Sequence, residues 1–149
     1  MDFDPHRHGS IGYLTNWAAR LFVRALERRI PGGSAGPMPV FIALADGSAL
    51  PQKELARRAA VEQPTMANTL ARMERDGLVA GAPDPTDGRS TLLSLTPAGL
   101  ERAKAALVAA ETTSALGLSA LKPDEREPFL DMLRRVIAVL DADGQRTDG

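Results

Sequence analysis

The chain has 149 residues, of which 44% are hydrophobic and 25% charged, a composition typical of one soluble folded domain rather than a disordered tail or a collagen-like fibre. It has no cysteine, which excludes thiolate nucleophiles, Cys-ligated zinc or iron–sulfur sites and thiol-based redox sensing. The N-terminus is acidic where a signal peptide is basic, and no stretch approaches the roughly 18 apolar residues of a membrane span. A cytoplasmic protein is therefore expected.

The net charge is −1, from 18 basic and 19 acidic side chains, which by itself argues against a nucleic-acid partner. Residues 1–31 carry five basic and three acidic groups, and residues 51–104 carry eight basic and seven acidic groups. Residues 105–149 carry five basic and eight acidic groups. The middle is thus slightly basic and the C-terminal end acidic, a bias too small to decide for or against DNA.

Hydrophobic periodicity predicts four helices in the first half of the chain. Apolar side chains at helical spacing, with arginines between them, predict a long amphipathic helix over residues 11–30. The Pro- and Gly-rich run 31–39 is expected to be a loop, with the glycines of 32–36 as a hinge. Three shorter helices follow, with a turn at 60–62 before the last of them: 40–45, 51–59 and 63–76.

The hydrophobic period changes after residue 77. Two β-capable runs, 78–80 and 91–95, flank the turn formers of 83–88, which predicts a hairpin with a projecting tip. Thr96 and Pro97 then supply an N-cap and a first-turn proline for a helix. Its apolar positions step by three and four residues, as in a coiled-coil seam: Leu100, Ala103, Leu107, Ala110, Ser114, Gly117 and Leu121.

A last helix is predicted to begin at Pro123, with a kink or a late start at Pro128 and an apolar stripe from Phe129 to Leu140. The predicted order is therefore four helices, a hairpin and two helices, without an internal repeat. Two short helices joined by a tight turn and followed by a hairpin are typical of a winged helix-turn-helix. The sequence predicts a mostly α fold with a small β-hairpin wing.

Five segments in order, between about residues 38 and 104, resemble the MarR family of bacterial transcriptional regulators: Glu54–Ala56, Gln63–Leu70, Met73–Val79, Asp84–Ser90 and Leu95–Gly99. The resemblance implies one domain over 1–149, in which 38–104 form a winged helix-turn-helix lobe that binds DNA. Residues 1–37 and 105–149 then supply dimerisation helices. It also implies a homodimer on palindromic DNA, usually a repressor, released by a small and often phenolic ligand.

Candidate DNA-binding residues lie on both helices of this motif. The N-terminal half of the second helix enters the major groove, where side chains with paired donors and acceptors read base edges. Its candidates are Gln63, Thr65, Asn68 and, further along, Arg72. Gln52 and Lys53 start the first helix and are placed to touch phosphate. The alternative is that these polar residues form an ordinary solvated helix face.

Arg89 at the hairpin tip is a candidate for the minor groove, where narrow A·T tracts concentrate negative potential. In the resembled family the corresponding Asp orients this Arg, which implies a supporting role for Asp87. Gly88 stands between them, where a bulkier residue is frequent in the family, and it adds flexibility. The alternative is an exposed tip that carries only a surface pair.

A ligand pocket is predicted where the dimerisation helices meet the DNA-binding lobe. Tyr13, Trp17 and Phe41 are half of the chain's six aromatic residues and are expected at this junction. A flat aromatic effector could lie against Trp17, with Arg20 near its carboxylate or phenolate. The alternative for each aromatic side chain is plain core packing.

Motifs for other functions are missing from the sequence. It has no Gly-x-Ser-x-Gly, no Gly-x-x-x-x-Gly-Lys and no His-Glu-x-x-His, so neither an enzyme nor a cofactor is expected. His6 and His8 have no third ligand at fixed spacing, so no metal site is predicted. The near-neutral charge keeps a second interpretation open, a winged-helix protein-interaction module without DNA binding.

Overall fold

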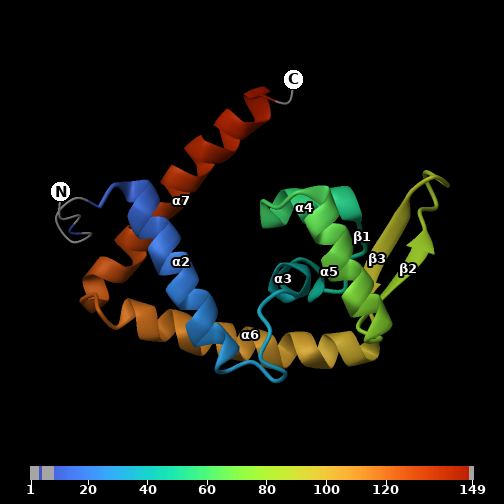
Figure 1. Cartoon of the computed structure of the whole chain (residues 1–149), viewed down its shortest axis with the longest axis horizontal. Coiled ribbons are helices and arrows are strands. Elements are labelled where there is room, and N and C mark those ends of the chain that lie inside the picture. The colour runs from blue at the N-terminus through green and yellow to red at the C-terminus, as the bar shows by residue number, and fades with distance from the viewer. Residues whose placement is uncertain (1–3, 5–8, 148–149) are drawn as a thin grey trace. The chain divides into compact units, whose positions relative to one another are not determined.

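The computed structural model describes Asp4 and residues 9–147. Its helices and strands, labelled in Figure 1, are α2 (Ile11–Glu27), α3 (Met38–Leu44), β1 (Leu50–Pro51), α4 (Gln52–Ala59), α5 (Gln63–Arg75), β2 (Val79–Pro83), β3 (Thr91–Leu95), α6 (Pro97–Leu118) and α7 (Pro123–Thr147). The mostly helical fold with a small hairpin is confirmed. None of the helices within the described residues combines the length and apolar character that crossing a membrane requires.

Three helix boundaries differ from the predicted ones by one residue: α3 ends at Leu44, α4 begins at Gln52 because Pro51 is in β1, and α5 ends at Arg75. Two others differ by more. α2 ends at Glu27, so residues 28–30, predicted to be helical, form a turn. α3 begins at Met38, although 38 and 39 were predicted to belong to the loop. Pro39 fits there because the amide groups of a first helical turn have no partner inside the helix, so a missing N–H costs nothing.

The wing is part of a three-stranded antiparallel sheet with the strand order β1-β3-β2. β2 pairs with β3 from Val79 opposite Leu95 to Pro83 opposite Thr91. Pro83, expected in the turn, is therefore in a strand, which is tolerated because β2 lies at the sheet's edge. The sequence did not predict β1, because two residues are too few to show a strand period.

The buried face of α6 overlaps the predicted seam in part, since Ala103 belongs to both and Leu107 and Ala110 of the seam are half-buried against the core. Ala103 is the one predicted seam position that is buried, while Ser114 and Gly117 are exposed. The buried face runs through small residues: Gly99, Ala103, Ala106, Ala109 and Thr113. α6 carries apolar residues on more than one side, so the sequence pattern could not fix which side faces the core. Of the kink or late start predicted at Pro128, the late start is excluded, because α7 runs from Pro123 through Pro128; the kink stays a prediction.

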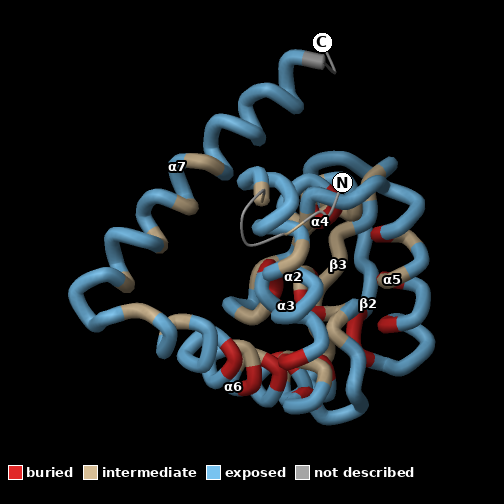
Figure 2. The backbone as a smooth tube through the Cα atoms, turned by 60° about the vertical axis from the view of Figure 1, so that its left-hand side comes forward, coloured by how far each residue is buried: buried red, intermediate tan, exposed pale blue. Residues whose placement is uncertain are grey.

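Internal contacts divide the chain into two units, Met1–Thr113 and Ser114–Gly149. The core of the first unit is shared by α3, α4, α5, the start of β2 and α6, and its largest fully buried side chains are Val40, Leu44, Leu55, Met66 and Met73. The second unit has no buried residue among those described, as the absence of red along α7 in Figure 2 shows. Six of its large apolar side chains are exposed: Leu116, Phe129, Met132, Ile137, Val139 and Leu140. The predicted division into a lobe at 38–104 and flanking dimerisation helices stays a prediction.

Candidate nucleic-acid interface

α4 and α5 form a helix-turn-helix held together by a shared core. Leu55 on α4 and Met66 and Leu70 on α5 are all buried in it. Between the helices Ala60 adopts a left-handed backbone with φ of +52°, and its N–H donates to the carbonyl of Arg57 at 3.1 Å. This conformation turns the chain sharply, so that α5 begins three residues later.

The first turns of α5 expose the polar side chains that the sequence predicts to read bases. Gln63, Thr65 and Asn68 are exposed. Thr65, Asn68 and the exposed Arg72 follow one another at i, i+3 and i+7, so they share one helix face. No side chain caps the start of α5, which leaves amide groups of its first turn available to an outside acceptor.

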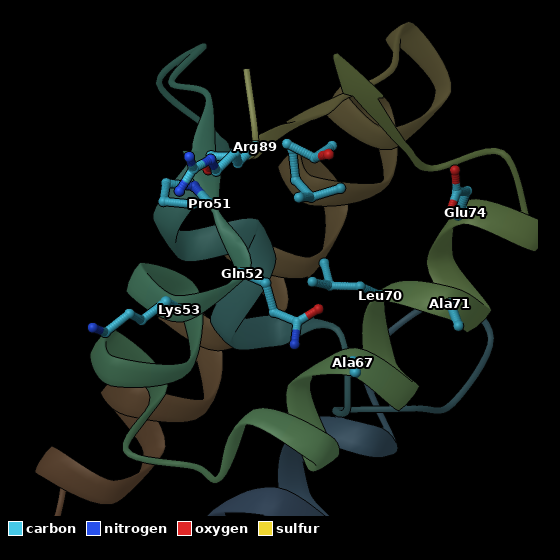
Figure 3. Close-up of a pocket in the computed structure, with 11 residues that line it drawn as sticks. Pro51, Gln52, Lys53, Ala67, Leu70, Ala71, Glu74 and Arg89 are labelled. Atoms are coloured by element: carbon cyan, nitrogen blue, oxygen red, sulfur yellow. The ribbon is translucent and has the colours of Figure 1, made fainter. Parts of the chain in front are cut away.

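A neighbouring face of α5, through Ala67, Ala71 and Glu74, borders a groove of about 430 Å³ between α4 and the wing. Figure 3 shows Gln52 pointing from α4 toward Ala67 of α5, and Lys53 pointing away from it. Arg89, from the wing, lines the same groove as Pro51 (Figure 3). The structure therefore brings together three predicted DNA-binding residues from two separate elements. Gln52 also donates from Nε2 to the carbonyl oxygen of Gln63 at 3.4 Å, which links the starts of the two helices.

The wing tip is ordered by two aspartates that bind the main chain. Asp84 Oδ1 accepts from the Thr86 N–H at 2.9 Å and from the Thr86 hydroxyl at 2.8 Å. Asp87 Oδ1 accepts from the Arg89 N–H at 3.0 Å, and its carbonyl accepts from the Ser90 N–H at 3.0 Å. Asp87 thus holds the backbone of Arg89, with no ion pair to the guanidinium within the described residues. The hydrogen bonds from Thr86 also keep the pKa of Asp84 below its ordinary value.

Three charges on α4 neutralise one another in part. Glu54 accepts hydrogen bonds from Arg57 at 2.9 and 3.0 Å and from Arg58 at 2.7 Å. Hydrogen bonds from Arg57 and then from Arg58 lower the pKa of Glu54 from 4.5 to about 2. Lys53, Arg72 and Arg89, by contrast, make no side-chain ion pair within the part of the chain that the structure describes.

The predicted ligand-binding residues are not brought together by either the groove beside α5 or a second, smaller cleft. The rings of Tyr13 and Trp17 lie 5.9 Å apart on α2. Phe41 is buried and lines a separate cleft of about 200 Å³, together with Arg72 and residues that include Arg102. Arg20 is exposed on α2 and does not border that cleft. Ligand binding by these residues stays a prediction.

Other sites were either outside the described residues or missed by the sequence. His6 and His8 fall outside the described residues, and those that the structure does describe form no cluster of three or more metal-ligating side chains. Sequence reasoning missed Ala67 and Ala71, the small residues of α5 that line the groove. Their spacing of i and i+4 on an otherwise polar side was the available signal.

A helix-turn-helix followed by a projecting hairpin defines the winged-helix class of DNA-binding proteins, and known proteins agree. The MarR family model matches residues 38–90. A transcriptional regulator of Mycobacterium tuberculosis, MT0903.1, is 32% identical over 120 residues, 79% of this chain and 84% of its own length. The chain belongs to the MarR family of transcriptional regulators.

Two further relatives carry more informative names. The transcriptional repressor NicR of Pseudomonas putida is 34% identical over 95 residues, and this match spans 64% of the chain but only 60% of NicR. The structure of Bordetella bronchiseptica BpsR, whose DNA binding is regulated by 6-hydroxynicotinic acid, superposes with a TM-score of 0.78 at 26% identity. That superposition covers 90% of this chain and 97% of BpsR.

Proposed function

We propose that this protein is a transcriptional repressor that binds a palindromic operator as a homodimer and releases it when a small aromatic acid binds. The groove in which Gln52, Lys53 and Arg89 gather beside α5 is the observation that carries the proposal. A duplex seated on α5 would meet these side chains with its phosphates, while Gln63, Thr65 and Asn68 face base edges in the major groove. The proposed binding to chromosomal DNA would take place in the cytoplasm.

Arg89 is proposed to follow the adjacent backbone or enter the minor groove, with Asp87 positioning it through the main chain. The hydrogen bond from the Arg89 N–H to the Asp87 carboxylate supports this, because it fixes the main chain from which the Arg89 side chain projects. Arg72, on the same face of α5 as Thr65 and Asn68, is proposed to reach a base or a phosphate beyond the first turns.

Exposed apolar side chains support the homodimer. Leu21 and Phe22 on α2 are 49% and 44% exposed, and Ile137 and Leu140 on α7 are 56% and 66% exposed. Scattered apolar residues are normal on a surface, but exposed apolar side chains that recur along two helices are typical of an interface. A second copy of the chain, joined through α2, α6 and α7, is the partner proposed to cover them.

The proposed effector is a flat aromatic acid of the kind that regulates BpsR. The Tyr13 and Trp17 pair on α2 and Phe41 on α3 are proposed to contact the ring, and Arg20 its carboxylate or phenolate. The three residues on α2 do not form a closed cleft with Phe41 in one chain, so the complete pocket is proposed to need the dimer.

Selection of duplexes from a random-sequence pool by the purified protein tests the proposal, followed by a salt titration of the selected duplex. Lys53, Arg72 and Arg89 of two protomers would neutralise about four to six phosphates, so log Kd should change with log salt by a slope of about 4 to 5. A protein-interaction module would retain no duplex. Binding without salt dependence would contradict phosphate contact.

A further inference from the structure

The recognition helix α5 ends in a backbone arrangement that exposes two carbonyl groups to α6. Gly77 takes a left-handed φ of +71°, its N–H donates to the Glu74 carbonyl at 3.0 Å, and the Leu78 N–H donates to the Met73 carbonyl at 2.8 Å. This pair of bonds is a Schellman motif, which fixes the path of the chain after the helix. The carbonyl groups of Gly77 and Leu78 are therefore held in place relative to α5.

Thr96 binds both of these carbonyl groups and the start of α6. Its hydroxyl donates to the Gly77 oxygen at 2.6 Å and accepts from the Gly99 N–H at 3.0 Å. Its own N–H donates to the Leu78 oxygen at 3.0 Å. One side chain thus caps α6 and ties it to the end of α5, although residue 96 lies 19 positions after residue 77.

Gly99 brings the two helices into direct backbone contact. A Cβ atom at this position would lie 2.0 Å from the Leu78 oxygen and 2.9 Å from its carbonyl carbon. Both are main-chain atoms and cannot rotate away. The first turn of α6 therefore packs against the backbone of Leu78 without an intervening side chain, and its orientation follows that of α5 closely.

We propose that Thr96 is a positioning residue for DNA recognition, because its hydroxyl fixes the angle between the recognition helix and α6. This rests on the proposed function, in which α6 helps to join two protomers on one operator. α6 has 22 residues and is about 33 Å long, and a tilt of about 5° at one end of such a helix moves the other by about 3 Å. Adjacent base pairs are about 3.4 Å apart. A tilt of α6 by about 5° at Thr96 would therefore change the spacing of the two recognition helices by about the rise of one base pair.

Three substitutions separate the two roles of this hydroxyl. Thr96→Ser keeps both hydrogen bonds. Thr96→Asp keeps an acceptor for the Gly99 N–H, so α6 stays capped, but it has no proton to donate to Gly77. Thr96→Val keeps the shape and loses both bonds. Thr113→Val is the matched control, because the Thr113 hydroxyl is buried in the same helix and donates only within it, to Ala109 at 2.8 Å.

The experiment compares binding to a duplex selected by the wild-type dimer and to a duplex carrying only one of its half-sites. Thr96→Asp and Thr96→Val should weaken binding to the full duplex about five- to tenfold, the factor expected for one hydrogen bond. Binding to the half-site should stay within about twofold of the wild type. Both variants should also lose less affinity than the wild type when one base pair is inserted between the half-sites. Thr96→Ser and Thr113→Val should match the wild type on both duplexes.

Two results would overturn the proposal. Equal weakening on the full duplex and the half-site would mean that Thr96 supports the fold of the lobe and not its spacing. If Thr96→Asp bound both duplexes as tightly as the wild type, the hydroxyl would act only as an N-cap. If circular dichroism showed that Thr96→Val does not fold, the comparison would be made with Thr96→Asp alone. A wild-type protein that selects no duplex would instead refute the proposed function.

Discussion

Gly99→Ala should lower the free energy of unfolding more than alanine does at a glycine whose added Cβ would meet open space or an ordinary van der Waals contact. The added methyl would lie 2.0 Å from the Leu78 oxygen, so α6 must shift by more than an ångström to restore a normal contact. Overpacking of a rigid contact costs about 1–3 kcal/mol and occasionally more, and the shift also lengthens the Thr96 bonds. We expect a loss of about 3 kcal/mol, which lowers the Tm by roughly 6–12 °C for a chain of this size.

Two other glycines provide controls for this prediction. Gly77 has open space around it but a φ of +71°, so Gly77→Ala should cost about 1–2 kcal/mol through backbone strain alone. Gly88 has nothing within 4 Å and no positive φ, so Gly88→Ala should change the stability by less than about 0.5 kcal/mol or increase it slightly. Thermal unfolding is followed by circular dichroism at one fixed protein concentration, because a dimer's Tm depends on concentration.

The order of the three variants is the test. Gly99→Ala should have the lowest Tm, Gly77→Ala an intermediate one and Gly88→Ala the highest. If Gly99→Ala melted together with Gly88→Ala, α6 would not approach Leu78 as closely as described, and the Thr96 inference would lose its geometric basis.

Three further predictions concern the site. Arg89→Ala should weaken operator binding by about 1–3 kcal/mol per half-site in a fluorescence anisotropy titration, while Lys104→Ala on exposed α6 should not; equal binding by both variants would remove the wing from the interface. Because the pKa of Glu54 is lowered from 4.5 to about 2, its ion pairs stabilise the fold above pH 4.5 and lose this effect as the pH falls toward 2. The difference in urea midpoint between wild type and Glu54→Gln should therefore be larger at pH 7 than at pH 3, and a difference independent of pH would contradict this account. Hydroxylated aromatic acids should change the fluorescence of Trp17, the single tryptophan, and should weaken operator binding. If neither the fluorescence nor the binding changed at millimolar ligand, the proposed ligand pocket would be wrong.

The elements of the fold were largely predictable because they depend on local signals. Helical spacing predicted α2 to α5, and the turn formers after Ala82 predicted the wing. The buried face of α6 was not predictable, because apolar residues on several sides leave the sequence pattern without a unique phase. β1 was not predictable either, since its two residues are a strand only through pairing with Leu92 and Leu93 of β3.

The candidate site was predictable as a set of residues but not as an arrangement. Gln52 and Lys53 follow from their place at the start of a helix-turn-helix, and Arg89 follows from the wing motif. Arg89 and Pro51 line one groove because β1 and β3 are neighbours in the sheet, which is a contact between distant parts of the chain. Asp87 was expected to orient the Arg89 side chain, and the structure gives it a main-chain contact because the tight turn brings the amide nearer.

The near-neutral net charge is compatible with binding to DNA because of where the charges are compensated. Arg57 and Arg58 are paired with Glu54 on α4, so they contribute little to the field outside. Lys53, Arg89 and Glu74 line the groove without an ion-pair partner among the described residues, so its unpaired charges sum to +1, and the surplus of acidic groups lies in residues 105–149. A phosphate within a Debye length of about 8 Å responds to the nearest unpaired charges and not to the sum over the chain. Local pairing of charge, rather than total charge, is therefore the quantity that decides whether this lobe attracts DNA.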